Sequence, residues 1–374
     1  MKRVLILNAG SSTLKWVVLD ATTSSVQAKG ATDWSPAHGE QQRSALRSAL
    51  KDVADVAAIG HRVVHGGTAF SKAVIIDSKV KAAIKELAVL APLHNPAALA
   101  GIETSGQLYP GVPQVAAFDT AFHATMPDQA AIYPLPWEWT ERWGLRRMGF
   151  HGLSVQYAVR RTTEMLGHLP PRLVVCHLGA GCSLTAVADG RSIDTTMGFT
   201  PLEGLMMAVR SGSVDPGLLL YLLREQHVDA DELEATLNGR SGLLGTSGVS
   251  ADLRAVIADA QRGNQRAALA IGMFIHRVVG AVGWLVGVLG GLDALVFTGG
   301  IGENSPLVRE RVCQQFGYLG LRLDSQANAT ASADIDISGP DGAARTLVIA
   351  AREDLAVLED MRPLLWPRDA QQPA

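Results

Sequence analysis

Short apolar runs separated by polar turns are the first pattern along the chain. Val4 to Leu7 is followed by the turn Asn8 to Lys15, which reads N-A-G-S-S-T-L-K, and the apolar pattern resumes at Trp16 to Leu19. Two strands joined by a hydroxyl-rich turn fit this spacing. Such a turn directs backbone N–H groups, hydroxyls and one lysine to a single place, as a phosphate site requires. An ordinary polar hairpin is the alternative.

The same arrangement returns in the second half of the chain. Leu173 to Cys176 runs into the polar, glycine-containing turn His177 to Ser183, and Leu184 to Ala188 is apolar again. Asn8 and His177 therefore occupy equivalent places. The repetition predicts a duplicated α/β unit with a cleft between the copies, and chance similarity of two hairpins is the alternative.

Helical and strand-like patterns fill the remaining chain. The polar stretch Thr22 to Gln42 predicts a linker, and a strand at Gln114 to Phe118 leads into Asp119. A buried strand at Leu292 to Phe297 meets a glycine turn that opens a helix at Pro306, a geometry compatible with phosphate. The predicted helices are Arg43 to Val53, Val80 to Leu90, Gly217 to Gln226, Asp231 to Leu237, Ala251 to Ala260 and Gln265 to Val288.

Composition and charge narrow the class of protein. A length of 374 residues predicts two or three domains. A net charge of −3 without a basic block argues against nucleic-acid binding. Three scattered cysteines without a C-x-x-C pair predict a reducing, cytoplasmic location. The longest uncharged run, Val278 to Leu292, is too short to cross the roughly 30 Å hydrocarbon core as a helix, so no membrane partner is expected.

The candidate chemistry lies in polar residues at strand ends and glycine turns. The chain has no G-x-x-x-x-G-K-[ST] phosphate loop, no protein-kinase catalytic set and no G-x-S-x-G elbow. His61 and His65 lie four residues apart, but no third zinc ligand can be placed. One site that collects cations, amides and carboxylates suits phosphoryl transfer, in which catalysis is largely positioning and charge neutralisation. For any single member, a surface ion pair or a helix cap is the simpler interpretation.

Nine stretches, in order and covering nearly the whole chain, resemble the acetate kinases. That family belongs to the superfamily of sugar kinases, actin and heat-shock ATPases. The stretches are N-A-G-S-S-T-L-K (8–15), H-R-V-V-H-G-G (61–67), L-A-P-L-H-N-P (90–96), F-D-T-A-F-H-A-T-M-P (118–127), G-F-H-G (149–152), G-F-T-P-L-E-G-L-M-M (198–207), R-S-G-S-V-D-P (210–216), L-L-G-T-S-G-V-S-A-D-L-R (243–254) and F-T-G-G-I-G-E-N-S (297–305).

The resemblance implies a fold, an assembly and a reaction. The fold is α/β: a two-domain duplicated actin-like ATPase (ribonuclease H-like) fold with an interdomain cleft. It implies an N-terminal domain at 1–149, completed by a C-terminal helix at 352–366, and a nucleotide-binding domain at 150–351. It also implies a homodimer and a reversible, Mg²⁺-dependent transfer of the γ-phosphoryl group of ATP to acetate, which gives acetyl phosphate and ADP.

The resemblance also assigns ligands by position. Asn8 and Glu353 are implied to hold Mg²⁺, or Mn²⁺ in its place. The implied ATP-binding residues are Lys15, His177, Leu178, Gly179, Ala180, Gly181, Asp252, Leu253, Arg254, Gly300, Ile301, Gly302, Glu303 and Asn304.

The acetate-binding and catalytic residues are implied in the same way. Arg62 resembles the ligand of the acetate carboxylate, and His151 and Arg210 resemble the groups that stabilise the transferring phosphoryl group. Asp119 matches the catalytic aspartate. Because acetate is already ionised at neutral pH, Asp119 has no substrate proton to remove, and orienting Mg²⁺ or a cationic neighbour is the better physical role. The implied methyl pocket consists of Val64, Leu93, Phe150 and Pro201.

Four departures from the family pattern qualify these roles. Ala180 replaces the asparagine of H-L-G-N-G, which predicts weaker or altered phosphate contacts rather than loss of activity. Ala208-Val209 replaces glycine-threonine, Val155 replaces a histidine, and Arg352 begins R-E-D-L in place of N-E-E-L.

Two alternatives stay open. A propionate or other short-chain carboxylate kinase would share the fold, because one methylene is worth only about 0.8 kcal/mol of transfer free energy. A catalytically inactive nucleotide-binding relative is supported by Ala180 alone.

Overall fold

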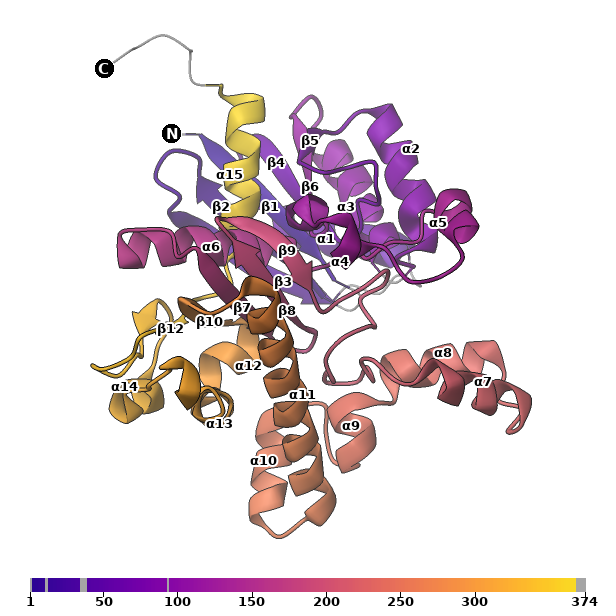
Figure 1. Cartoon of the computed structure of the whole chain (residues 1–374). Coiled ribbons are helices and arrows are strands. Elements are labelled where there is room, and N and C mark those ends of the chain that lie inside the picture. Colours follow the sequence, from indigo (N-terminus) through magenta and orange to yellow (C-terminus); the bar gives the residue numbers. More distant parts are fainter. Residues whose placement is uncertain (1, 11–12, 34–38, 93, 368–374) are drawn as a thin grey trace. The chain divides into compact units, whose positions relative to one another are not determined.

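The computed structural model describes residues 2–10, 13–33, 39–92 and 94–367, and the chain forms two compact units (Figure 1). Unit 1 comprises Met1–Ala124, Phe150–Tyr157 and Arg352–Ala374, and unit 2 comprises Thr125–Gly149 and Ala158–Ala351. The segment 125–149 therefore clusters with unit 2, although the sequence assigns it to the first domain.

Unit 1 is built on a six-stranded sheet in the order β3-β2-β1-β4-β6-β5. β1, β4 and β6 are parallel, whereas the β1–β2, β2–β3 and β5–β6 pairs are antiparallel. The side chains of Leu5, Leu14 and Ile59 are fully buried at its core, which explains the apolar runs in the sequence. The strands are β1 Arg3–Ala9, β2 Thr13–Asp20, β3 Val26–Asp33, β4 Val56–Val63, β5 Val74–Ile75 and β6 Gln114–Phe118.

The predicted linker at Thr22 to Gln42 is wrong in its first half, where β3 pairs with β2. β3 is an edge strand with one covered face, so its sequence lacks an apolar run. Gly30 lies opposite Trp16, and a Cβ atom there would lie 2.6 Å from the indole ring. The Trp16 ring therefore packs over Gly30, a residue type that the sequence pattern alone does not place in a strand.

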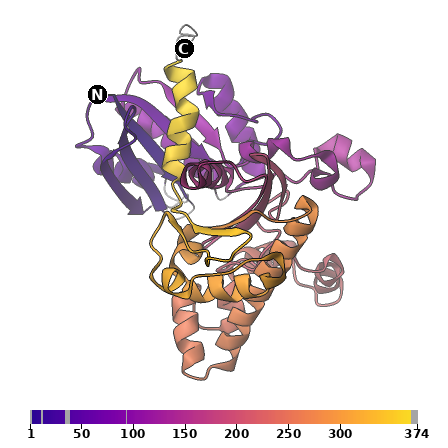
Figure 2. The same cartoon turned by 60° about the vertical axis from the view of Figure 1, so that its left-hand side comes forward.

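Helices cover the first sheet. The helices are α1 Gly39–Leu50, α2 Ser78–Glu86, α3 Asn95–Leu108 and α15 Glu353–Leu365, with 3₁₀ turns at Leu87–Val89 and Ala121–Thr125. The C-terminal helix α15 packs on β1, β4 and β6, and Figure 2 shows it, in yellow, along this sheet. Gly60 in β4 permits the approach, because a Cβ atom there would lie 2.6 Å from both Val357 and Met361.

Unit 2 repeats the sheet of unit 1. Its order is β11-β12-β10-β7-β8-β9, with β7, β10 and β12 parallel and the other pairs antiparallel. Each strand of the first sheet has a counterpart in the second, so the predicted duplication is confirmed. The strands are β7 Arg172–Leu178, β8 Cys182–Ala188, β9 Arg191–Thr195, β10 Ala294–Thr298, β11 Ile335–Asp336 and β12 Arg345–Val348.

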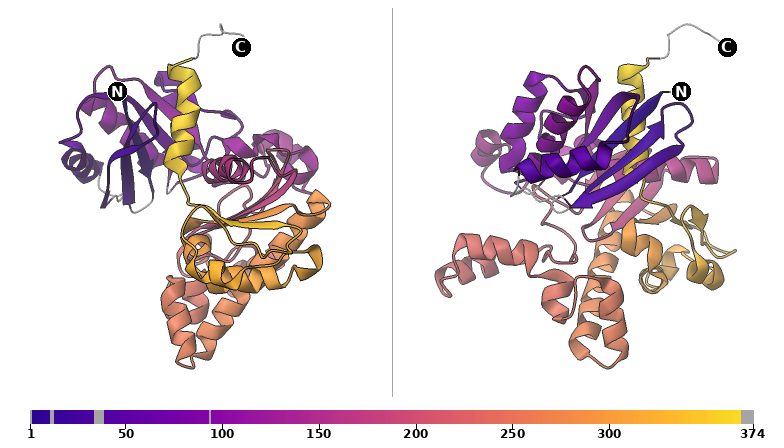
Figure 3. Two further views of the ribbon diagram at one scale, coloured as in Figure 1. Left: turned by 90° about the vertical axis from the view of Figure 1, so that its left-hand side faces the viewer. Right: turned by 180° about the vertical axis from the view of Figure 1, so that it is seen from behind.

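The helices of the second half match the predicted helical region. α10 and α11 lie side by side, as both views of Figure 3 show. The helices are α4 Asp128–Ala131, α5 Trp137–Trp143, α6 Gly152–Leu166, α7 Pro216–Arg224, α8 Ala230–Gly239, α9 Gly242–Ser247, α10 Leu253–Gln261, α11 Gln265–Leu289, α12 Gly299–Asn304, α13 Pro306–Gln314 and α14 Ser325–Thr330, with a 3₁₀ turn at Gly317–Leu319.

Among the described residues, α11 is the one helix long and apolar enough to cross a membrane by length and composition. It has 25 residues and is therefore longer than the uncharged run Val278 to Leu292, which was judged too short to cross a membrane. The helix itself is therefore long enough to span the roughly 30 Å hydrocarbon core, although the uncharged run Val278 to Leu292 is not. However, 44% of its most apolar window is buried within the protein, and it packs against β7, β8 and β9. A core helix passes the same test, so the helix is weak support for a membrane span.

Candidate active site

The parallel strands of unit 1 bring polar residues to one edge of the sheet. Asn8 in β1 lies opposite Arg62 in β4, and Asp119 directly follows β6. Glu353 is the first residue of α15, which packs on the same strands. These four residues, here the carboxyl-end cluster, occupy the edge at which parallel α/β sheets bind ligands.

Arg62 is the centre of the carboxyl-end cluster. Its Nε donates to Oδ1 of Asp119 at 3.0 Å, its second terminal nitrogen bonds Oδ2 of the same carboxylate, and Nη1 donates to Oδ1 of Asn8 at 3.0 Å. Nε also lies 3.3 Å from Oε2 of Glu353. The amide of Asn8 closes the ring by donating to Oε2 of Glu353 at 2.7 Å. A guanidinium has five N–H groups, so this arrangement leaves two for a further acceptor.

Burial and charge set the electrostatics of this cluster. The pKa of Asp119 is raised to about 6: burial is the largest cause, Arg62 opposes it, and Glu353 adds to it. Burial acts against the charge on Arg62, but Asp119 and Glu353 outweigh it and raise its pKa. Arg62 is thus a permanent cation beside two acids, and Asp119 orients it, which is one of the two roles expected from the sequence.

His151 adjoins the carboxyl-end cluster through strained backbone. Its φ is +58°, a left-handed conformation uncommon for a residue with a side chain. Its backbone N–H contributes a hydrogen bond that lowers the pKa of Asp119. The next residue, Gly152, donates to the backbone oxygen of Asp119 at 2.9 Å, and a Cβ atom there would lie 2.1 Å from that oxygen. The G-F-H-G stretch (149–152) therefore packs closely against the backbone of Asp119. Backbone strain such as that at His151 concentrates at functional sites.

The predicted methyl pocket is described in part. Val64 and Phe150 are buried, with 5% and 1% of their surface exposed, and the Phe150 ring meets His65 edge-on at 5.4 Å. Leu93 lies outside the described residues. Asn95, which the sequence analysis did not single out, donates to the backbone oxygen of His65 at 3.0 Å and accepts from its N–H at 3.1 Å. The available signal in the sequence was Asn95 directly before Pro96, a pair typical of a helix start.

In unit 2 the turn after β7 is held by its own backbone. Gly179 N–H donates to the oxygen of Gly181 at 3.0 Å, and Ala208 N–H donates to the oxygen of Ala180 at 3.2 Å. His177 is largely buried, whereas Ala180 is exposed. Two departures from the family pattern, at Ala180 and Ala208, are therefore joined by one hydrogen bond.

Arg210 lies near this turn and faces no acid among the described residues. Its Nη1 donates to the oxygen of Pro201 at 3.3 Å, and the nearby Cys182 opposes the lowering of its pKa by burial. Cys182 directly follows the 179–181 turn. A partly buried arginine without a carboxylate partner is prepared for an anion.

The glycine-rich segment after β10, predicted as a turn, forms the short helix α12, and it depends on a buried arginine that the sequence did not reveal. Arg309 in α13 is fully buried, and its Nη1 donates to the oxygens of Gly302 and Glu303 at 2.9 and 2.8 Å. Asn328 binds the rest of its guanidinium at 2.8 and 2.7 Å. An arginine between the apolar positions Val308 and Val312 was the signal. Arg309 thus fixes the end of α12, whose residues the resemblance assigns to ATP.

The other predicted nucleotide ligands have local partners. Asp252 caps α10 by accepting from Arg254 N–H at 2.9 Å, and the two side chains form an exposed ion pair. Oε1 of Glu303 accepts from Ala351 N–H at 3.0 Å, and Asn304 folds back onto the Gly300 oxygen at 2.9 Å. Lys15 lies opposite Asn8 in β2 with an exposed side chain.

Within the described residues no group of three or more His, Cys, Asp or Glu forms a metal site of its own. The carboxyl-end cluster offers oxygen atoms from Asn8, Asp119 and Glu353. Mg²⁺ usually binds through one or two carboxylates and completes its shell with water and substrate phosphates. The donor set therefore fits a hard divalent ion that is bound together with a nucleotide.

Comparison with known proteins gives one family. The sequence profile of the Acetokinase family matches residues 42–359. An acetate kinase of Rippkaea orientalis is 45% identical over 96% of this chain and 98% of its own length. An acetate kinase of Cyanothece sp. is 53% identical over 83% of this chain and 76% of its own.

Solved structures agree with this result. The acetate kinase of Porphyromonas gingivalis matches with a TM-score of 0.89 and 36% identity, covering 98% of this chain and all of its own. A propionate kinase from Francisella tularensis matches with a TM-score of 0.88 and 38% identity, covering 96% and 99%.

Proposed function

The chain belongs to the acetokinase family, and from that premise we propose that it is a phosphotransferase that moves the γ-phosphoryl group of ATP to acetate, reversibly, giving acetyl phosphate and ADP. The observation that carries the proposal is the guanidinium of Arg62, held by Asp119 and Asn8 with two N–H groups left over. A planar fork of donors fixed in this way matches a carboxylate.

Unit 1 binds the carboxylate substrate in this scheme. Asp119 holds Arg62 in one orientation, and Arg62 donates its remaining N–H groups to acetate. Val64 and Phe150, two buried side chains of unit 1, are our candidates for contact with the methyl group, and the resemblance adds Leu93 and Pro201. Because two anions must approach each other in the reaction, the fixed positive charge of Arg62 lowers their repulsion in a site with little water.

A divalent metal, Mg²⁺ or Mn²⁺, would be held by Asn8 and Glu353, with Asp119 as a further oxygen donor. When bound, it neutralises charge on the β- and γ-phosphates and orients them. Asn8 donates to Glu353 through its amide nitrogen and accepts from Arg62 at Oδ1, so these hydrogen bonds hold the side chains of Asn8 and Glu353 side by side.

Unit 2 binds the nucleotide. We assign the phosphates to His177–Gly181 and Gly300–Asn304, where backbone N–H groups supply the donors, with Lys15 and Asp252–Arg254 as further contacts. Arg210 and His151 stabilise the charge on the transferring phosphoryl group. The partly buried guanidinium of Arg210, without an acidic partner among the described residues, supports its part in this role.

Acetate is the proposed acceptor, and propionate is the second candidate. Val64 narrows the pocket, but one methylene changes binding by only about 0.8 kcal/mol. The similarity to a protein described as a propionate kinase keeps this alternative open.

We also propose a homodimer that works in the cytoplasm. The three cysteines Cys176, Cys182 and Cys313 are free and buried, as suits a reducing compartment.

Hydroxamate trapping of acyl phosphate tests the proposal. The full chain is incubated with ATP and Mg²⁺ and with acetate, propionate or butyrate in parallel, and ATP alone is the control. The proposal expects the highest kcat/KM with acetate and a slower reaction with propionate. A higher value with propionate would transfer the assignment to the second candidate, and no product with any acid would indicate an inactive nucleotide-binding relative.

A further inference from the structure

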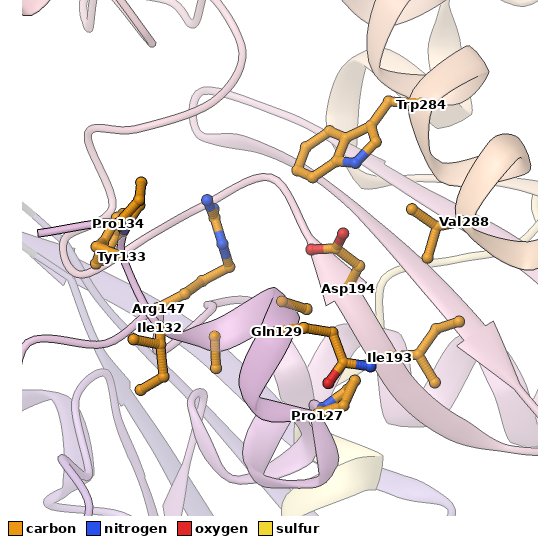
Figure 4. A pocket seen from close by; sticks show the side chains of 12 residues that line it. Pro127, Gln129, Ile132, Tyr133, Pro134, Arg147, Ile193, Asp194, Trp284 and Val288 are labelled. Carbon is orange, nitrogen blue, oxygen red and sulfur yellow. The ribbon is translucent and has the colours of Figure 1, made fainter.

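Unit 2 contains a cavity of about 560 Å³ that none of the proposed catalytic residues lines. Its wall includes Ile132, Tyr133, Arg147, Asp194, Trp284 and Val288 (Figure 4). The residues come from the segment after α4, from β9 and from α11. A volume of this size accommodates a small organic molecule, and walls of this kind combine apolar area with a few polar groups.

The most unusual group in the wall is the carboxylate of Asp194. Only 4% of this residue is exposed, and Oδ1 accepts from Thr195 N–H at 2.8 Å. In the part of the chain that the structure describes, Oδ2 has no hydrogen-bond partner. Figure 4 shows the carboxylate pointing toward the indole of Trp284. Burial raises the pKa of Asp194, Arg147 opposes that effect, and Glu203 adds to it. A buried carboxylate with an open oxygen favours a donor from a ligand.

The nearby cation, Arg147, is shared between two carboxylates, Asp194 and Glu203. Arg147 binds Oε1 of Glu203 through Nη2 at 2.8 Å. Its Nη1 donates to the backbone oxygens of Thr195, Thr196 and Met197 at 3.1 to 3.3 Å. The charges of Arg147 and Glu203 therefore offset each other, and one negative charge is left at the wall of the cavity.

The aromatic residues at the cavity already accept one cation. The guanidinium carbon of Arg147 lies 5.7 Å from the ring centre of Tyr133 and 5.9 Å from that of Trp284. Trp284 is still 43% exposed, so its ring has surface for another group. An aromatic ring beside an uncompensated carboxylate is the combination that recognises organic ammonium ions.

We propose that this cavity binds a small organic cation with a short apolar chain, such as an alkylammonium ion. The ammonium group donates to Oδ2 of Asp194 and lies against Trp284. The chain contacts the apolar side chains of Ile132, Ile193 and Val288. The site lies outside the proposed catalytic residues, so this proposal does not depend on the phosphotransferase assignment.

Calorimetric titration of the full chain with n-butylammonium chloride tests this site, in phosphate buffer at pH 7.5, because Tris is itself an organic cation. n-Butanol is the neutral control of the same length. We expect saturable binding of butylammonium and at least about tenfold weaker binding of butanol, the difference that one charge-assisted hydrogen bond supplies. Equal affinities, or no binding of butylammonium, would overturn the proposal.

Variants locate the binding. Asp194→Asn keeps Oδ1 for the Thr195 N–H and removes the charge, so affinity should fall about tenfold or more while the far-UV spectrum and melting temperature stay close to those of the parent. Trp284→Ala should weaken binding, and Trp284→Phe should restore part of it. Asp189→Asn changes an exposed acid in the turn before β9 and is the matched control. An unchanged affinity of Asp194→Asn for butylammonium would contradict the site. If a second copy of the chain fills the cavity, the dimer will show no butylammonium binding, and this outcome also contradicts the proposal.

Discussion

The two sheets share one strand order but carry different residues at equivalent ends. In unit 1, β1 and β4 present Asn8 and Arg62 opposite each other, and Asp119 follows β6. In unit 2, the matching positions on β7 and β10 are His177 and Thr298, and the residue after β12 is Ile349. Asp119 and Ile349 each directly follow a strand, and each donates a backbone hydrogen bond to the parallel neighbour strand, at 3.0 and 2.9 Å.

This difference separates two tasks that one topology can perform. The ends in unit 1 form a charged network around Arg62, which suits recognition of a carboxylate and a metal. The strand ends in unit 2 present the 179–181 turn, fixed by backbone hydrogen bonds, and the short helix α12, fixed by Arg309, which suits a polyphosphate bound by N–H groups. The edge of a parallel sheet supplies the position, and the residues at the strand ends decide the chemistry.

Removing Arg62 should have the largest effect of any single substitution in the two sets of strand ends. Arg62→Ala leaves Asp119 and Glu353 facing each other without a cation, so we expect kcat/KM to fall by about 10³-fold or more and unfolding free energy to fall by about 3 kcal/mol. Steady-state kinetics and urea unfolding measure both effects. Thr298→Val, at the equivalent position in unit 2, is the control and should cost less than about tenfold. Similar losses at the two positions would show that the division of tasks is wrong.

Arg210→Ala should have the next largest effect. If Arg210 acts on the transferring phosphoryl group, kcat falls about 10²- to 10³-fold while KM for ATP and acetate stays within about threefold. Arg262→Ala is the matched control, because Arg262 is an exposed arginine of unit 2 that is paired with Asp259 and has no proposed role in the site. An increase in KM at unchanged kcat would assign Arg210 to ground-state binding instead.

The raised pKa of Asp119 predicts a pH dependence in unit 1. Ionised Asp119 orients Arg62, so kcat/KM should fall about tenfold per pH unit below an apparent pKa of about 6. Asp119→Asn should remove this limb. A profile without a break between pH 5 and 7 would show that the ionised carboxylate is not required.

The free energy of unfolding should change with pH in the opposite direction to kcat/KM over the same pH range. Between pH 4 and 6 the folded protein retains a proton that the unfolded chain has released, so the contribution of Asp119 to unfolding free energy decreases as pH rises. The difference between wild type and Asp119→Asn isolates this contribution, because their other titrating groups are shared. Urea unfolding at pH 4.5 and 7 measures it.

The sequence predicted the elements whose residues carry a strong local pattern. The buried strands were predicted from their apolar runs, and Asp119 directly follows β6 as expected. The turn predicted at Asn8 to Lys15 was too long, because β1 continues to Ala9 and β2 begins at Thr13, so Asn8 and Lys15 are paired strand residues. β3 was missed because an edge strand has little apolar surface. Arg309 was missed because its partners are backbone oxygens on another element, and no spacing in the sequence marks them.

The smallest expected effect concerns the altered turn of unit 2. Ala180 is exposed, and its backbone oxygen is held by Ala208 N–H at 3.2 Å, so Ala180→Asn adds an amide without disturbing the turn. If the turn binds the phosphates, the new donor should lower Kd for ATP about five- to tenfold, with kcat within about twofold. Nucleotide titration and steady-state kinetics measure the two values, and Ala180→Leu, which adds bulk without a donor, is the control.

A second variant adds Ala208→Gly and Val209→Thr to Ala180→Asn. Because Ala180 and Ala208 share a hydrogen bond, this variant should bind ATP more tightly still. An unchanged Kd in both variants would show that backbone groups alone bind the nucleotide in this half of the fold.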